Sequence, residues 1–192
     1  MKRIGLVLLV VAGLSPIAQA NDTFKIDPAR STIAFKVRHM LGTAKGNFSK
    51  FSGTIVADRE RPEQSSVTVT IDAASIDTGI VKRDEHLRGE LFNVAKFPEI
   101  TFKSRRVKQT GTNAGEIIGD FTMHGVTRAI TLNVQLVGGA DAAAKNAASH
   151  WRVTTAPLRR SQFGLVFSKS AETISMIADE VAVDIEIEAR RQ

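Results

Sequence analysis

Residues 26–53 read IDPARSTIAFKVRHMLGTAKGNFSKFSG, and this stretch decides the fold. Side chains alternate between the two faces of a β-strand with a period of two residues. After Ser31, one face therefore carries apolar side chains that end in a histidine: Ile33, Phe35, Val37 and His39. The residues between them are mostly polar. This pattern predicts a strand with one buried face and one wet face.

The chain then turns back twice over a short distance. Gly42 and Thr43 form the first turn, and the returning run carries Gly46 and Phe48 in phase with each other. Residues 54–58 begin a third run after Gly53. Short links between successive strands are typical of an antiparallel meander. We expect this meander to continue until it closes around an apolar interior.

Residues 1–20 have the parts of a secretory signal peptide. The start is basic, residues 4–14 are apolar, and Ala18-Gln19-Ala20 is an A-x-A cleavage site. The apolar run is shorter than the roughly 20 residues of a spanning helix, which disfavours a retained membrane anchor. We expect cleavage before Asn21 and a periplasmic location in a cell of the Gram-negative type.

Composition indicates one domain over residues 21–192. Of the 192 residues in the full chain, 43% are hydrophobic and none is a cysteine, so stability must come from burial and sheet pairing. Removal of Lys2 and Arg3 changes the net charge from +6 to +6 − 2 = +4. The basic residues form no strip interleaved with aromatics, and we expect no nucleic-acid partner.

Residues 116–137 contain the clearest hairpin, with His124-Gly125 as a two-residue loop. A loop of this length pairs Phe121 with Arg128. The apolar positions switch from odd to even numbers across the loop, as this register requires. The same register places Arg128 on the apolar side of the hairpin.

One segment breaks the strand pattern and predicts a short helix. Asp77-Thr78 is a candidate N-cap, the residues that follow are charged, and Gly89 can end the helix. Leu87 and Leu91 are four residues apart and would face the sheet together. We expect this helix to cap one end of the fold.

The alternating segments amount to about eight strands and one helix. An antiparallel sheet with one apolar face must bury that face and its edges, and closure into a barrel does both. The prediction is an all-β antiparallel barrel of about eight strands with one short capping helix. Such a barrel either fills with side chains or holds one small ligand.

Seven short motifs cover the mature chain in order. They are Ile26-Asp27-Pro28 with Ser31, Ile33 and Phe35; Val37-x-His39; Gly46-x-Phe48 with Phe51-x-Gly53; Arg83-Asp84-x-His86-Leu87; Phe92 with Phe97-Pro98-x-Ile100-x-Phe102; Gly119 with His124-Gly125-Val126; and Arg160-x-x-Phe163-Gly164. The ordered set resembles the YceI-like family of exported polyisoprenoid-binding proteins. The chain departs from the family pattern at Gln162, where an acidic residue is usual, and at Phe24, because it has no tyrosine.

The resemblance implies an elongated, lipocalin-like barrel that holds a long isoprenoid chain in its tunnel and forms homodimers. Burial of each CH₂ group gains about 0.8 kcal/mol, so a carrier needs mainly an apolar sheath. The expected ligand-binding residues are Ile33, Phe35, Val37, His39, Phe48, Val67, Val69, Ile71, Phe102, Phe121, Arg128, Ile130, Leu132 and Val183. The alternative is that the apolar members of this set simply fill a solid core.

The sequence allows two interpretations of several polar residues. His39 ends its strand and either bonds a head group or bonds backbone near the rim. Arg128 could extend to the mouth. We expect Arg160 to be buried against loop carbonyls, with a ligand head group as its alternative partner, and His86 to join the helix to the barrel. His124 and His150 are expected to be plain surface residues.

The sequence contains no motif of a familiar enzyme class. There is no cysteine nucleophile, no G-x-S-x-G, no HExxH and no P-loop. The adjacent Asp84, Glu85 and His86 would point apart on a helix, and the four histidines have no metal-ligand spacing. We expect neither catalysis nor a metal or cofactor, apart from bound lipid.

The leading hypothesis is a periplasmic carrier of a long polyisoprenoid, of the isoprenoid-quinone or polyprenyl type, that makes transient membrane contact. The second hypothesis is a stress-linked interaction protein with a solid core, whose outer face binds a membrane or respiratory component.

Overall fold

The computed structural model describes residues 21–139, 147–168 and 176–192. The expected signal peptide lies outside these residues. The strands are β1 (Asp22–Ile26), β2 (Thr32–His39), β3 (Gly42–Phe48), β4 (Phe51–Ala57), β5 (Ser66–Asp72), β6 (Ile76–Asp77), β7 (Glu99–Gly111), β8 (Ala114–Met123), β9 (Val126–Gly139), β10 (Ala148–Thr154), β11 (Leu158–Arg159) and β12 (Glu180–Arg191).

The helical segments are short. They are the 3₁₀ turns η1 (Pro28–Arg30), η2 (Pro62–Gln64), η3 (Ala73–Ser75) and η5 (Arg160–Phe163), the α-helix α1 (Val81–His86) and the π-helical turn η4 (Leu87–Leu91). In the part of the chain that the structure describes, no helix is long and apolar enough to cross a bilayer.

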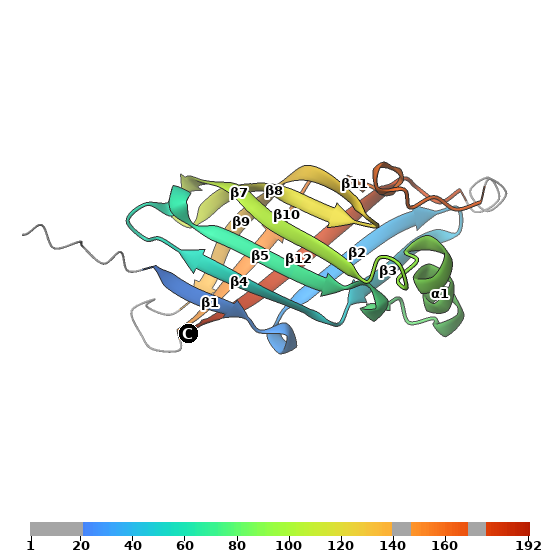
Figure 1. Cartoon of the computed structure of the whole chain (residues 1–192), viewed down its shortest axis with the longest axis horizontal. Helices are drawn as coiled ribbons and strands as arrows, with labels where there is room; N and C mark the ends of the chain where they lie inside the picture. Colours follow the sequence, from blue (N-terminus) through green and yellow to red (C-terminus); the bar gives the residue numbers. More distant parts are fainter. Residues whose placement is uncertain (1–20, 140–146, 169–175) are drawn as a thin grey trace, which may run out of the picture.

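Eight strands form a closed antiparallel barrel. The order around the ring is β1-β4-β5-β7-β8-β9-β10-β12, and β12 pairs with β1 to close it. Strands β2, β3 and β6 continue β1, β4 and β5 beyond short interruptions and extend the barrel towards α1 (Figure 1). The predicted barrel of about eight strands with one short helix is confirmed.

The predicted hairpin of β8 and β9 is confirmed in register. Phe121 pairs with Arg128 and Met123 with Val126. His124 and Gly125 have φ angles of 52° and 75°, the left-handed conformation that a two-residue type I′ turn requires at both positions. The loop therefore twists in the sense of the strands that it joins.

The prediction of an Asp77-Thr78 N-cap was wrong. Helix α1 begins at Val81, and Ile80 in the N-cap position makes no side-chain cap. The backbone N–H of Thr78 is instead bound by the Asp84 carboxylate at 3.0 Å, from within the helix. This bond holds the loop before the helix against α1. Asp77 and Thr78 therefore lie ahead of the helix and do not occupy its N-cap position.

The closing seam of the barrel runs along β12. One edge of β12 pairs with β2 over Val181–Glu186 and with β1 over Ala189–Arg191. Between these two ladders the chain leaves the sheet as η1. The gap is closed by backbone bonds to Glu188, whose carbonyl accepts from Asp27 N at 2.9 Å and whose N–H donates to Ser31 Oγ at 2.9 Å.

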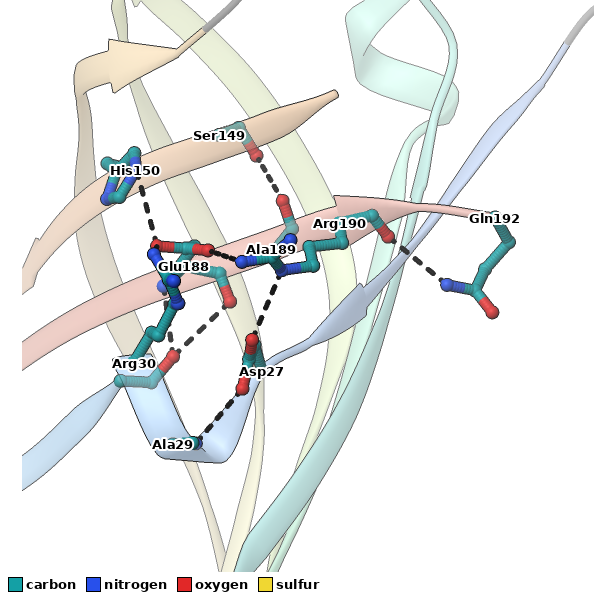
Figure 2. Close-up of polar contacts among 10 residues, drawn as sticks. Asp27, Ala29, Arg30, Ser149, His150, Glu188, Ala189, Arg190 and Gln192 are labelled. Carbon is teal, nitrogen blue, oxygen red and sulfur yellow. Dashed lines mark hydrogen bonds and ion pairs between the residues drawn. The ribbon is translucent and has the colours of Figure 1, made fainter. Parts of the chain in front are cut away.

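The Glu188 side chain holds the same gap from outside the barrel. It is 2% exposed, and three cationic or titratable groups surround its carboxylate (Figure 2). Arg190 Nη2 lies at 2.8 Å, His150 Nε2 at 3.4 Å and Arg30 Nη1 at 3.7 Å. These partners come from β12, β10 and η1, so one carboxylate joins three parts of the seam.

Replacement of Glu188 tests this seam. Glu188→Ala is expected to lower the free energy of unfolding by about 1–3 kcal/mol, because it removes the buried carboxylate that accepts from Arg190 and lies against His150 and Arg30. Glu186→Ala is the matched control: Glu186 also faces outward on β12 and pairs with Arg152 at 2.9 Å, but its side chain is 46% exposed. Its loss should change stability by less than about 1 kcal/mol. Equal effects in urea unfolding would contradict a special role for Glu188.

Candidate ligand-binding cavity

The barrel encloses an apolar cavity of about 670 Å³. Drug-sized ligands occupy pockets of roughly 300–1,000 Å³, so the volume suits a small-molecule guest. At one end the wall includes residues of β2, α1 and the segment after η5. At the other end it includes the β4–β5 loop and the β7–β8 turn, so the cavity follows the long axis of the barrel.

Nearly all residues of the predicted ligand-binding set lie in the cavity wall. They are Ile33, Phe35, Val37, His39, Phe48, Val67, Val69, Ile71, Phe102, Phe121, Ile130, Leu132 and Val183. Alternation along the strands thus brought residues from seven different strands to one surface. Their contact with a ligand stays a prediction.

Arg128 is the exception and corrects the predicted set. It pairs with Phe121 as expected, but its side chain is exposed and does not line the cavity. Its Nε donates to the carbonyl of Gln162 in η5 at 3.4 Å. The inner space at this level is taken by Phe163, whose ring meets that of Phe121 edge-on at 5.4 Å. Arg128 therefore lies across η5, outside the cavity.

The wall contains many residues that the predicted set omitted. Several of them lie on the inward face of a strand, where alternation of apolar and polar residues could have predicted them. They are Ile55, Val134, Leu136, Trp151, Val153, Ile185 and Ile187. Leu165, Phe167 and Ile177 come instead from segments without regular periodicity. No pattern in the sequence signals that these three face inward.

Glycines in the wall make room for large side chains of neighbouring strands. A Cβ on Gly46 would lie 2.5 Å from Cζ of Phe35, and a Cβ on Gly119 would lie 2.5 Å from Cζ of Phe102. Both distances are far inside van der Waals contact. Because each ring occupies the space above a glycine, it packs along the wall.

A cluster of polar side chains lies where the cavity meets α1. Arg83 donates from Nε to Thr78 Oγ1 at 2.7 Å and from Nη2 to the Thr78 carbonyl at 2.9 Å. Asp84, which is 5% exposed, accepts from the Thr78 N–H. Thr78 and Arg83 are also in the cavity wall. This end therefore offers polar atoms to a ligand head group, although Arg83 is already bonded to protein.

Arg160 is buried against loop carbonyls, as predicted. It is 6% exposed and donates to the carbonyls of Leu165 at 2.7 Å, Ala178 at 3.1 Å and Ile177 at 3.3 Å. Its guanidinium carbon lies 5.1 Å from the centre of the Phe167 ring. These bonds tie the segment after η5 to the segment before β12.

Two other histidines at this end, besides His39, have different roles. His86 pairs with Glu90 at 3.2 Å and stacks on Phe167 at 6.2 Å, which joins helix to barrel as predicted. His124 is not the plain surface residue that we expected. Its Nδ1 lies 3.2 Å from the Phe163 carbonyl, and its ring meets Phe97 at 4.5 Å.

The Asp179 carboxylate binds η5 at the α1 end of the barrel. Burial raises the pKa of its carboxyl, but hydrogen bonds from Ser161 and the nearby charges of Arg160 and Arg159 outweigh this effect, and the net pKa is lowered. The bonds come from Ser161 N at 2.9 Å and Ser161 Oγ at 2.8 Å. The ionised carboxylate therefore stabilises η5.

A pH series tests this anchor. A lowered folded-state pKa stabilises the protein above the unfolded value of about 3.9, and the contribution is lost as pH falls through the folded pKa. Asp179→Asn should therefore be less stable than the parent chain at neutral pH, and the difference should shrink below about pH 4. Thermal unfolding across pH measures this, and a constant difference would refute the ionic role.

The chain is similar to known proteins over most of its length. The model of the YceI-like domain matches residues 24–189. The UPF0312 protein VPA0850 of Vibrio parahaemolyticus is 38% identical over 135 residues, which are 68% of this chain and 71% of that protein. Protein YceI of Salmonella newport is 39% identical over 122 residues, which are 62% of this chain and 63% of that protein.

Solved structures share the fold. The crystal structure of BcnA from Burkholderia cenocepacia superposes with a TM-score of 0.73 at 26% identity, covering 85% of this chain and 98% of that one. A polyisoprenoid binding domain from Saccharophagus degradans superposes with a TM-score of 0.64 at 19% identity, covering 88% of this chain and 98% of that one. On the match over residues 24–189, the chain belongs to the YceI-like family.

Proposed function

We propose that this protein is a periplasmic carrier that holds one long isoprenoid chain, of the quinone or polyprenyl type, in its barrel. The observation that carries the proposal is the apolar cavity of about 670 Å³ along the barrel axis. A long hydrocarbon chain gains about 0.8 kcal/mol for each CH₂ that leaves water, so such a wall binds it without many polar contacts.

The family relationship supports the same assignment. A structural neighbour is described as a polyisoprenoid binding domain, and its barrel covers 88% of this chain. Polar residues of the wall cluster towards the ends of the cavity, including Thr78 and Arg83 at one end and Asp58 and Arg59 at the other. This distribution suits a ligand with a long apolar tail and a small polar head.

The second hypothesis loses its main premise. A stress-linked interaction protein with a filled barrel was expected to show side chains meeting across the axis, and the cavity argues against this packing. The homodimer, the periplasmic location and the absence of catalysis stay predictions. Sedimentation of the mature protein and fractionation of the native host would test the first two.

The direct test is to extract the protein purified from its native host with organic solvent and to analyse the extract by mass spectrometry. We expect a hydrophobic long-chain molecule at close to one per barrel. A folded protein that yields no such molecule, and takes none up from detergent-solubilised polyprenol, would overturn the proposal.

Adjacent residues of β5 provide a matched pair of variants. Val69 lies in the cavity wall, whereas Thr68 is exposed on the outer face. Val69→Asp should lower bound lipid roughly tenfold or more, because an unpaired carboxylate in an apolar cavity is strongly unfavourable. Thr68→Asp should leave lipid binding unchanged.

A second variant covers the case in which Val69→Asp does not fold. Val69→Phe keeps the wall apolar but reduces the space for a guest, and it should lower the yield of bound lipid per folded protein. Circular dichroism establishes folding first. Undiminished lipid in both folded variants would show that this face does not line the ligand site.

A further inference from the structure

Exposed apolar side chains gather at one end of the barrel. Among the described residues, six of the seven large apolar side chains that are exposed lie at the α1 end. They form what we call the apolar rim: Met40, Leu41, Ile80, Val81, Val166 and Met176. Leu41 is 85% exposed and Val81 is 72% exposed. Gathered apolar groups mark interaction surfaces, whereas scattered ones need no explanation.

Several contacts link the segments that carry the apolar rim. Strands β3 and β6 pair, and a Cβ on Gly46 would lie 2.8 Å from Cγ2 of Thr78, so the β2–β3 hairpin lies beside the residues that lead into α1. The ring of Phe167, next to Val166, stacks on His86 of α1 at 6.2 Å. Ala178, two residues after Met176, donates its N–H to the Arg38 carbonyl at 2.9 Å. Helix α1 and the β2–β3 hairpin lie at the right-hand end of the barrel in Figure 1.

The apolar rim lies next to the cavity wall in the sequence. Every member is within two residues of a wall residue: His39 near Met40 and Leu41, Thr78 and Arg83 near Ile80 and Val81, Phe167 beside Val166, and Ile177 beside Met176. The seventh exposed residue, Val137, lies near the opposite end of β9 and belongs to no such group.

The opposite end of the barrel is charged. Asp22 and Asp58 are each 5% exposed. Arg59 and Arg191 pair with Asp22, and Arg61 Nη2 lies 3.6 Å from Asp58 Oδ2. Burial of such ion pairs against hydrocarbon is unfavourable, since they would lose water. Among the described residues, this end carries no comparable group of exposed apolar side chains.

We propose that the apolar rim docks the barrel on the surface of a lipid bilayer. The inference rests on the proposed function, because an insoluble chain moves most easily from bilayer to cavity when it does not cross water. Exposed basic side chains flank the rim: Arg38 precedes Met40 by two residues, and Lys82 follows Val81. Their long stems suit apolar surroundings while their charges reach lipid phosphates.

Vesicle flotation tests the docking surface with the mature protein. Leu41→Glu and Val81→Glu should each weaken binding to vesicles of phosphatidylcholine with phosphatidylglycerol roughly tenfold, because each removes an exposed apolar side chain that docking would bury in the bilayer. The matched control is Val137→Glu, which removes an exposed apolar side chain at the other end and should leave binding unchanged. Equal loss in all three variants, or no binding by the parent chain, would overturn the proposal.

The absence of cysteine permits a second measurement that does not depend on loss of binding. Leu41→Cys and Val137→Cys are each labelled with a polarity-sensitive fluorophore. Vesicles should shift the emission to shorter wavelength at position 41 and not at position 137. A shift at both positions would indicate general adhesion, and a shift at neither would exclude docking.

A second copy of the chain is the competing occupant of the apolar rim. In that case the label at position 41 would shift with protein concentration in the absence of vesicles, and Leu41→Glu would convert dimers to monomers in sedimentation. Either result would refute bilayer docking. Solvent extraction of the same protein separates the two proposals. Protein that carries lipid but does not bind vesicles would refute only docking, whereas protein that carries no lipid would refute the carrier function.

Discussion

Closure of the ring along β12 is the constraint on which the rest of the structure depends. An open sheet of this length would leave one apolar face and two edges in contact with water. Strand β12 removes both edges because it pairs with β10 on one side and with β1 and β2 on the other. The chain interrupts the second ladder at η1, and Glu188 bridges the interruption with its backbone and its buried carboxylate. A chain without cysteine has no disulfide to hold such a seam, so hydrogen bonds and ion pairs must do so.

A closed ring of eight strands does not by itself produce a cavity, because side chains can fill an interior of this size. The placement of glycines decides the outcome here. Phe35 and Phe102 lie over Gly46 and Gly119, and Ile26 lies over Gly53 in the same way. Each large side chain uses space that a neighbouring Cβ would occupy, so it covers the wall and leaves the axis free. Glycine inside a strand is otherwise unfavourable, which indicates that close packing of this kind is its structural use.

Much of the barrel could be predicted from the sequence, because each strand with one buried face carries its own period-two signal. The hairpin at His124-Gly125 was predicted to the residue, since loop length sets the register. The same alternation placed nearly all of the predicted ligand-binding residues in the cavity wall. Periodicity failed at Arg128, where Phe163 from η5 occupies the inner space, and at Leu165 and Phe167, which face inward from an irregular segment. The N-cap of α1 also failed, because Asp84 binds the Thr78 N–H from inside the helix. The first two features depend on contacts between distant segments, which no local pattern records, whereas the third depends on a bond between residues six positions apart.

The contacts that stabilise the barrel lie mainly in its wall, and the interior along the axis is left for a ligand. Stability comes from the strand ladders, the seam at Glu188 and the packing of the cluster that includes Ile76, Ile100 and Phe163, all of which are almost fully buried. These contacts leave an apolar cavity of about 670 Å³ inside the barrel. A barrel that relied on side chains meeting at its centre would have to lose that packing to admit a guest, and interiors packed at normal density tolerate little such change. Because the wall is stabilised within itself, the axis is left available for a hydrocarbon chain, and entry needs rearrangement only at an end. The segments at the α1 end are irregular and are held by single side chains such as Arg160 and Asp179. Their local opening is therefore expected to require less free energy than opening of the barrel.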